Sequence, residues 1–415
     1  MKQKIYPGWW IVLTGVVLMG MVYAPMLTLP GVFTVPVTGD FGISRTTFNL
    51  HISICSLSST VAAVVGGKAF DKYSPRALMS FFAVLTGLCF GAYSFATNVY
   101  HFYVISAVFG FAGRFLSFVP VSILVTNWFG PRLKGKVMGV AMAGSGVGAV
   151  LLNPLLSATI ARYSWQAAYR LLSLLTFLLV LPLVVGTVIR SPADRGLPRL
   201  GDEPQQGEGA QPPDQLEGLR TDQALRSGLF WAMFGTFCLF SIAYTIFNNN
   251  AIPSMVDCGL DAVTAATVMS ISAFGIVVGK LLLGAISDRW NAKTAASVSI
   301  LCLMAGLGLF LLLPRAACFL LAAAGGFLFG VGNANCTVCM PLITSDLMGN
   351  RAFAQLFSYA SVASSLGATV GPLVGSLVFD RSGSYSGAWL ADLALSAFML
   401  CSLHLCYRLR GRAGT

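Results

Sequence analysis

Long apolar runs separated by short polar breaks dominate the chain. Most runs reach about 20 residues, the length that an α-helix needs to cross a hydrocarbon layer about 30 Å thick. The pattern predicts membrane-spanning helices over twelve segments: 9–36, 46–68, 77–97, 102–129, 136–160, 166–189, 228–252, 262–287, 294–313, 317–344, 352–379 and 386–407. We therefore expect an all-α membrane protein.

The longest polar interruption divides these segments into two groups of six. It covers 190–227 and is rich in Pro, Gly, Gln and acidic residues, a composition typical of a flexible linker. The predicted domains are an N-terminal six-helix bundle over 1–189, a flexible cytoplasmic linker over 190–227 and a C-terminal six-helix bundle over 228–415.

The overall charge follows from membrane topology. Charged residues make up 10% of the chain and hydrophobic residues 56%, whereas soluble domains carry about 25% charged residues. With a cytoplasmic N-terminus, most of the 26 Lys and Arg residues fall on the cytoplasmic side. This asymmetry obeys the positive-inside rule and predicts two cytoplasmic termini in a multi-pass protein of the cell (inner or plasma) membrane. The net charge of +11 therefore does not indicate nucleic-acid binding.

Motifs of enzymes and metal sites are missing from the sequence. It contains no Gly-x-Ser-x-Gly and no His-Glu-x-x-His, so nothing in it predicts hydrolysis. The ten cysteines lack metal-ligand spacing and lie mostly in apolar segments, where reduced core cysteines are expected. We expect a protein that is not an enzyme and has no metal or cofactor.

A short motif recurs at the end of the second predicted helix of each half. The first copy runs from Gly67 to Arg76 and the second from Gly284 to Lys293, and both read Gly-x-x-x-Asp followed by Lys or Arg. An Asp at a helix end can cap a neighbouring helix and pair with a cation, in a contact that breaks and reforms. The residues assigned to such conformational gating are Asp71, Arg76, Asp288 and Arg289.

The duplicated motif resembles the loop motif of the major facilitator superfamily, which implies twelve transmembrane helices in two pseudo-symmetric six-helix bundles. Further stretches resemble the monocarboxylate transporter branch and its bacterial relatives, including oxalate–formate exchangers. These stretches are Tyr6 to Trp10, Asn127 to Gly148, Trp165 to Arg170 and Ile252 to Leu260. The resemblance covers essentially the whole chain.

Glycines and prolines mark places where helices pack closely or bend. Gly139, Gly144 and Gly148 would let two membrane helices approach backbone to backbone, either in a sliding seam or in static packing. Pro25 and Pro30 interrupt the first predicted helix, as in helices that line a central cavity.

Two cations lie deep within predicted helices, one in each half: Arg114 and Lys280. A charge in hydrocarbon is costly unless a partner meets it, and no acidic residue accompanies either of these cations. A bound anion would complete both sites. Two alternatives stay open: Lys280 could extend its stem toward an interface, and Arg114 could bind backbone carbonyls at a helix break.

The resemblance implies a substrate-binding role for Lys280, because the monocarboxylate branch has a substrate-binding arginine at this place before the motif. The chain departs from its relatives at two positions. Ile276 stands where animal members have a proton-coupling aspartate, and Ala363 where oxalate–formate exchangers have a lysine. Neither the animal proton mechanism nor oxalate specificity is therefore carried over.

Uncharged polar side chains in the predicted helices are candidates for orienting a substrate: Asn249, Asn250, Asn335 and Tyr359. Hydrogen bonds between helices are the alternative role for such groups. Asp257, at the end of the seventh predicted helix, is the candidate for proton coupling, with a capping role as the alternative.

Together these observations predict a secondary active transporter of small organic anions, monocarboxylates or dicarboxylates such as hydroxy and oxo acids. It would work by alternating access, as an anion exchanger or a proton symporter. The expected partners are the anion, a proton or counter-anion, and membrane lipid, and we expect a monomer. The alternative is an efflux transporter for amphipathic compounds, which the lack of buried acidic residues disfavours.

Overall fold

The structure is a computed structural model, and every regular element that it describes is helical. It describes residues 6–189, 191–201, 219, 221–316, 318–349 and 352–413. Some side chains within helices, that of Asp71 among them, lie outside the described set. Eleven of the described helical segments are long and apolar enough to cross a membrane. A further helix, α4 (Arg45–Lys72), covers the predicted second span but is not among the eleven.

The chain forms two compact units. The first comprises 1–43 and 50–207, and the second comprises 44–49 and 208–415. The first turn of α4 therefore belongs to the second unit, although the rest of this helix belongs to the first. Half of the predicted linker lies outside the described residues; its described parts include the short helices η3 (Pro192–Arg195) and α11 (Thr221–Arg226).

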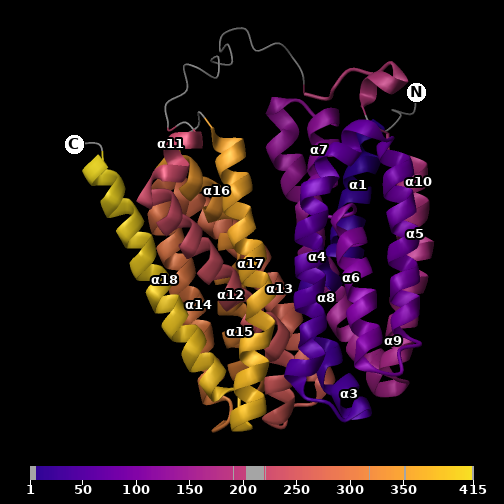
Figure 1. Cartoon of the computed structure of the whole chain (residues 1–415), viewed down its shortest axis with the longest axis vertical. Coiled ribbons are helices and arrows are strands. Elements are labelled where there is room, and N and C mark those ends of the chain that lie inside the picture. The colour runs from indigo at the N-terminus through magenta and orange to yellow at the C-terminus, as the bar shows by residue number, and fades with distance from the viewer. Residues whose placement is uncertain are drawn as a thin grey trace. The chain divides into compact units, whose positions relative to one another are not determined.

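The first unit contains several helices that break within one predicted span (Figure 1). Its remaining elements are α1 (Gly8–Leu18), η1 (Met19–Tyr23), α2 (Ala24–Leu27), α3 (Gly31–Phe41), α5 (Pro75–Tyr93), α6 (Val99–Arg114), α7 (Phe118–Trp128), α8 (Pro131–Arg162), α9 (Trp165–Leu175), η2 (Thr176–Val180) and α10 (Leu181–Thr187). The elements η1 and η2 are π-helical turns, which are frequent at functional sites.

The second unit consists of longer helices. They are α12 (Gly228–Asp257), α13 (Ala262–Arg289), α14 (Ala292–Leu312), α15 (Phe319–Asn333), α16 (Asn335–Met348), α17 (Phe353–Ser382) and α18 (Ser386–Ala413). Polar N-caps start several of them: Ser227 accepts from the backbone N–H of Phe230, and Asp261 from those of Val263 and Thr264. An α-helix satisfies its backbone N–H and C=O groups with internal hydrogen bonds, which allows such segments to enter a bilayer.

The predicted close approach at Gly144 and Gly148 is present within the first unit. A Cβ on either residue of α8 would collide with backbone atoms of Val16 or Gly20, whereas Gly139 has open space around it. Glycine at these two positions is therefore required by the packing of α8 on α1 and η1.

Candidate functional site

Arg114 ends α6 at a break in the fourth span of the first unit. The chain resumes its helix at Phe118, and Pro120 in the first turn of α7 cannot donate a backbone hydrogen bond across the gap. Ser117 Oγ donates to the carbonyl oxygen of Arg114 at 3.1 Å, which satisfies one group that the break frees. The break therefore places Arg114 at a helix end, where backbone N–H and C=O groups lack partners within the helix.

The guanidinium of Arg114 has no partner among the described residues. Its Nε is buried without a hydrogen bond, and no described carboxylate pairs with it. Its electrostatic neighbour is Tyr23, which belongs to the π-helical turn η1 of the first span. A buried donor without an acceptor costs free energy, so the arrangement favours an anion at this place.

The second unit repeats the break in its own fourth span. There α15 ends at Asn333 and α16 begins at Asn335, so that a polar residue again ends the first half of the span. Arg114 and Asn333 thus occupy corresponding places in the two units. This correspondence extends the internal repeat beyond the duplicated loop motif.

Lys280 lies on α13, is partly buried, and makes no hydrogen bond or ion pair with a described residue. Its electrostatic neighbour is the thiol of Cys336, in the first turn of α16. The ammonium therefore sits beside the broken fourth span of its own unit, as Arg114 sits in the broken span of the other. Among the described contacts, no backbone carbonyl accepts a hydrogen bond from the side chain of Arg114, which was the alternative that the sequence left open for that residue.

A glycine seam fixes the helix that carries Lys280. A Cβ on Gly279 would lie 2.6 Å from the carbonyl oxygen and 2.8 Å from the Cα of Val331 in α15. One turn earlier, a Cβ on Gly275 would lie 3.3 Å from the Cα of Gly330. The backbones of α13 and α15 are in contact along this seam, which determines the position of the residue next to Gly279.

The asparagines of α12 differ in how many of their groups are bonded. Asn250 is fully buried, donates to Ile246 O at 2.8 Å and accepts from Ser376 Oγ at 3.1 Å. Asn249 also donates within its helix, to Thr245 O, but its Oδ1 is buried and unbonded. Asn249 therefore keeps a free acceptor, whereas Asn250 is occupied in joining α12 to α17.

The other two orienting candidates have different surroundings. Asn335 is 5% exposed and has an unbonded Oδ1. It lines a small pocket between α12, α14, α16 and α18. Lys280 does not line that pocket. Tyr359 on α17 is 46% exposed. The described contacts do not bring these two residues together with Lys280.

Asp257 ends α12 and is held by Arg45, both residues being part of the second unit. Arg45 donates from its two terminal nitrogens to the two oxygens of Asp257, at 2.6 and 2.8 Å. Arg45 also donates to the hydroxyl of Tyr385 at 3.0 Å, and burial raises the pKa of Tyr385 to about 12, so the phenol stays neutral. The sequence analysis did not predict this pair.

The gating candidates lie at helix ends. Asp71 is in the last turn of α4, but its side chain lies outside the described residues. Arg76 Nε donates to the carbonyl oxygen of Val188 at 3.0 Å, which ties α5 to the end of α10. Asp288 is exposed, and the Arg289 guanidinium lies 5.6 Å from the ring centroid of Trp290. Asp288 has no hydrogen bond or ion pair with the described residues.

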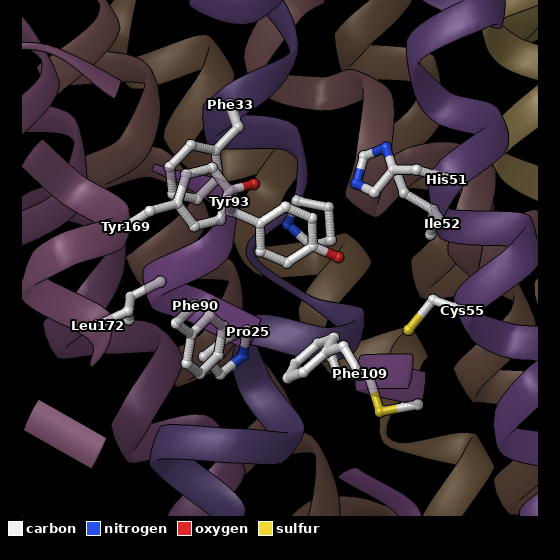
Figure 2. Close-up of a pocket in the computed structure, with 12 residues that line it drawn as sticks. Pro25, Phe33, His51, Ile52, Cys55, Phe90, Tyr93, Phe109, Tyr169 and Leu172 are labelled. Atoms are coloured by element: carbon white, nitrogen blue, oxygen red, sulfur yellow. The ribbon is translucent and has the colours of Figure 1, made fainter. Parts of the chain in front are cut away.

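A small aromatic pocket lies within the first unit. Figure 2 shows Phe33, Tyr93 and Tyr169 on one side, with Ile52 and Cys55 of α4 across from them. The Tyr169 ring stacks on Phe33 at 4.1 Å and on Tyr93 at 4.8 Å between centroids. Sequence reasoning missed this pocket, because the spacing of aromatic residues along separate helices does not reveal which helices meet.

The comparisons with known proteins support one family. The sequence pattern described as Major Facilitator Superfamily matches residues 10–354 and, in a second match, 247–414. The chain is 26% identical to monocarboxylate transporter 12 of Rattus norvegicus over 92% of the chain and 82% of that protein. It is 23% identical to monocarboxylate transporter 13 of Bos taurus, with 95% and 87% covered.

Solved structures share the fold at low sequence identity. A bacterial homologue of the human lysosomal transporter Spinster aligns with a TM-score of 0.73 and 13% identity, over 99% of this chain and 98% of that one. The nucleoside transporter NupG aligns with a TM-score of 0.75 and 12% identity, over 97% and 99%. The predicted resemblance and the predicted fold are both confirmed.

Proposed function

Since this chain belongs to the major facilitator superfamily and is a membrane transporter rather than an enzyme, we propose that it carries small organic anions by alternating access. The observation that carries the proposal is one half-buried cation in each unit, Arg114 and Lys280, that makes no side-chain hydrogen bond or ion pair with the described residues. Cationic cargo would require buried acidic residues at such places instead. The names of the relatives, monocarboxylate transporters, support the same substrate class.

The two cations suit a substrate with a carboxylate and a second acceptor. Arginine binds a carboxylate through two parallel hydrogen bonds, whereas lysine acts as a point charge. A monocarboxylate with a hydroxy or oxo group, or a dicarboxylate, offers acceptors of the kind that these side chains bind. The unbonded Oδ1 of Asn249 would accept from a hydroxyl of the same substrate.

For coupling, we favour anion exchange over proton symport. Asp257, the sequence-based candidate for proton coupling, forms a two-point ion pair with Arg45. Both carboxylate oxygens of Asp257 accept hydrogen bonds from Arg45, so we assign this residue a structural role. An anion returning through the same site would reset the transporter without a titrating group.

The remaining assignments complete the proposed cycle. Asp71, Arg76, Asp288 and Arg289 at the helix ends would control the exchange between outward-open and inward-open forms. The protein would act as a monomer in the cell membrane, with both termini in the cytoplasm.

The test is uptake of radiolabelled pyruvate into proteoliposomes of the purified protein. Internal unlabelled pyruvate should accelerate uptake by wild type, and Arg114→Gln or Lys280→Gln should reduce the rate at least tenfold. Arg315→Gln, which removes an exposed cation from a loop, is the matched control and should retain the wild-type rate. Unimpaired uptake in both site variants would refute the anion site, and uptake driven by a pH gradient without internal anion would refute exchange.

A further inference from the structure

The aromatic pocket of the first unit is too small for a substrate but large enough for water. Its volume is about 30 Å³. A buried water needs roughly 10–15 Å³ of such space, so about one or two waters fit. None of the described residues that line the pocket is acidic, so a metal cation would lack a counter-charge there. The space therefore admits a small neutral guest.

The break between α2 and α3 in the first span leaves polar groups of the backbone without partners. The first two N–H groups after α2 both donate to the carbonyl oxygen of Ala24, at 2.8 and 3.1 Å. The next residue, Pro30, has no N–H to donate. As a result, the carbonyl oxygens of residues 25–27 receive no hydrogen bond from the described residues. Two of these residues, Pro25 and Met26, line the pocket.

A hydroxyl group without a partner comes to the same pocket from α9. Tyr169 is only 5% exposed, and its hydroxyl makes no hydrogen bond with the described residues. Figure 2 shows its side chain reaching from the wall toward the interior of the pocket, across from His51. Stacking on Phe33 and Tyr93 fixes the direction of the ring. The Tyr93 hydroxyl differs, because it is already hydrogen-bonded to Ser106 Oγ at 2.6 Å.

A free donor and free carbonyl acceptors thus belong to residues around one small space. An unsatisfied polar group that is buried costs free energy, so a guest that completes these hydrogen bonds is favoured. Water can accept from a hydroxyl and donate to a carbonyl, and buried waters typically make about three hydrogen bonds. Ordered waters are also among the groups that satisfy the backbone at breaks of membrane helices.

We propose that the pocket binds one or two waters, which accept from the hydroxyl of Tyr169 and donate to the carbonyls freed at the break of the first span. The bound water joins α9 to this break and holds the bend between α2 and α3. The imidazole of His51 on α4 is a further polar group in the wall of the site. This inference is independent of the proposed function, since it involves no substrate.

The experiment is hydroxyl-radical labelling of the purified full-length protein by X-ray irradiation, read out by mass spectrometry. Radicals formed from a bound water label adjacent side chains, so the buried ring of Phe33 in the pocket wall should be labelled. Phe82 and Phe115 are also buried, stack on each other outside the pocket, and should stay unlabelled as matched controls. After dilution into oxygen-18 water, the label on Phe33 should acquire the isotope more slowly than the label on exposed Phe95.

A variant without the hydroxyl identifies the group that holds the water. Tyr169→Phe keeps the ring that stacks on Phe33, and labelling of Phe33 should fall several-fold in this variant. Tyr163→Phe, which removes a hydroxyl from an exposed side chain, should leave the labelling unchanged.

Two results would overturn the proposal. Labelling of Phe33 in the wild type that does not exceed that of Phe82 would show that no water is bound in the pocket. Unchanged labelling of Phe33 in folded Tyr169→Phe would show that the hydroxyl does not hold a water there. Neither result depends on anion binding, so the water site and the proposed function can fail separately.

Discussion

At the scale of single residues, Asp257 shows that the role of an acidic side chain depends on its hydrogen-bond partner. The sequence places it at the end of a membrane helix, where capping and proton coupling are both reasonable roles. The two hydrogen bonds from Arg45 and the neighbouring Tyr385 make it part of a structural cluster. No pattern of spacing could have predicted this, since Arg45 and Asp257 are far apart in sequence.

If the ion pair between Arg45 and Asp257 is structural, removal of either partner should change stability by a similar amount. We expect Arg45→Gln and Asp257→Asn each to lower the melting temperature of the purified protein, by the equivalent of roughly 1 kcal/mol. Exchange of labelled pyruvate for internal pyruvate should continue in both. Loss of uptake driven by a pH gradient in Asp257→Asn alone would instead show that Asp257 couples protons.

Asp392 on α18 corrects the expectation that the chain lacks buried acidic residues, which was used against the efflux alternative. It is fully buried, and both of its carboxyl oxygens lack hydrogen bonds among the described residues. An unsatisfied buried polar group costs about 1–3 kcal/mol. We expect Asp392→Leu to raise the melting temperature while preserving pyruvate exchange.

A matched variant on the same helix face checks this interpretation. Ser396, one turn further along α18, also has an unbonded buried hydroxyl, and Ser396→Ala should leave exchange unchanged. Abolished exchange in folded Asp392→Leu, with normal exchange in Ser396→Ala, would show that the carboxyl takes part in transport.

At the scale of helices, close packing on glycine is the feature that the sequence indicated best. The approach expected at Gly144 and Gly148 is present, whereas Gly139 in the same run has no neighbour within 4 Å. The π-helical turns η1 and η2 and the break after Arg114 were not predicted. Apolar periodicity is the same on both sides of such a break, so it cannot locate one.

The seam between α13 and α15 predicts opposite changes in stability when two glycines of α13 are replaced by alanine. Gly279→Ala would force Val331 away and should lower stability by about 1–3 kcal/mol. Gly284→Ala meets nothing within 4 Å and should be neutral or stabilising, by up to about 1 kcal/mol from helix propensity. Thermal unfolding measures both, and equal effects would contradict the seam.

The same two glycine variants also test whether the seam positions Lys280 for binding. Because Gly279 precedes Lys280, the Gly279→Ala variant should also bind pyruvate more weakly, whereas Gly284→Ala should bind it as wild type does. Unchanged affinity in a destabilised Gly279→Ala protein would show that the seam does not position Lys280.

At the scale of the whole molecule, hydrophobic runs and the duplicated motif were enough to predict the all-α membrane fold, and the family comparison confirms it. The candidate site was only partly predictable. Arg114 and Lys280 stand out in sequence because charges are rare in apolar runs. The aromatic pocket does not, since its residues come from five separated stretches of ordinary apolar helix.

The proposed topology can be tested by labelling intact cells with a membrane-impermeant maleimide. Cys318, exposed between α14 and α15, is expected to be outside and should react. Ala193→Cys in a Cys318→Ser background places a thiol at an exposed position of the predicted cytoplasmic linker. It should react only after permeabilisation, and labelling in intact cells would reverse the orientation.

The central claim is that Arg114 and Lys280 each contribute to anion binding, and the dissociation constant of pyruvate tests it most directly. Each charge-assisted hydrogen bond contributes roughly 1.5–3 kcal/mol, which corresponds to about a tenfold to more than a hundredfold change in affinity. Calorimetry on folded Arg114→Gln and Lys280→Gln should therefore give dissociation constants at least tenfold above wild type, with Arg315→Gln within twofold of it. A wild-type dissociation constant in either site variant would contradict the role of that residue in anion binding.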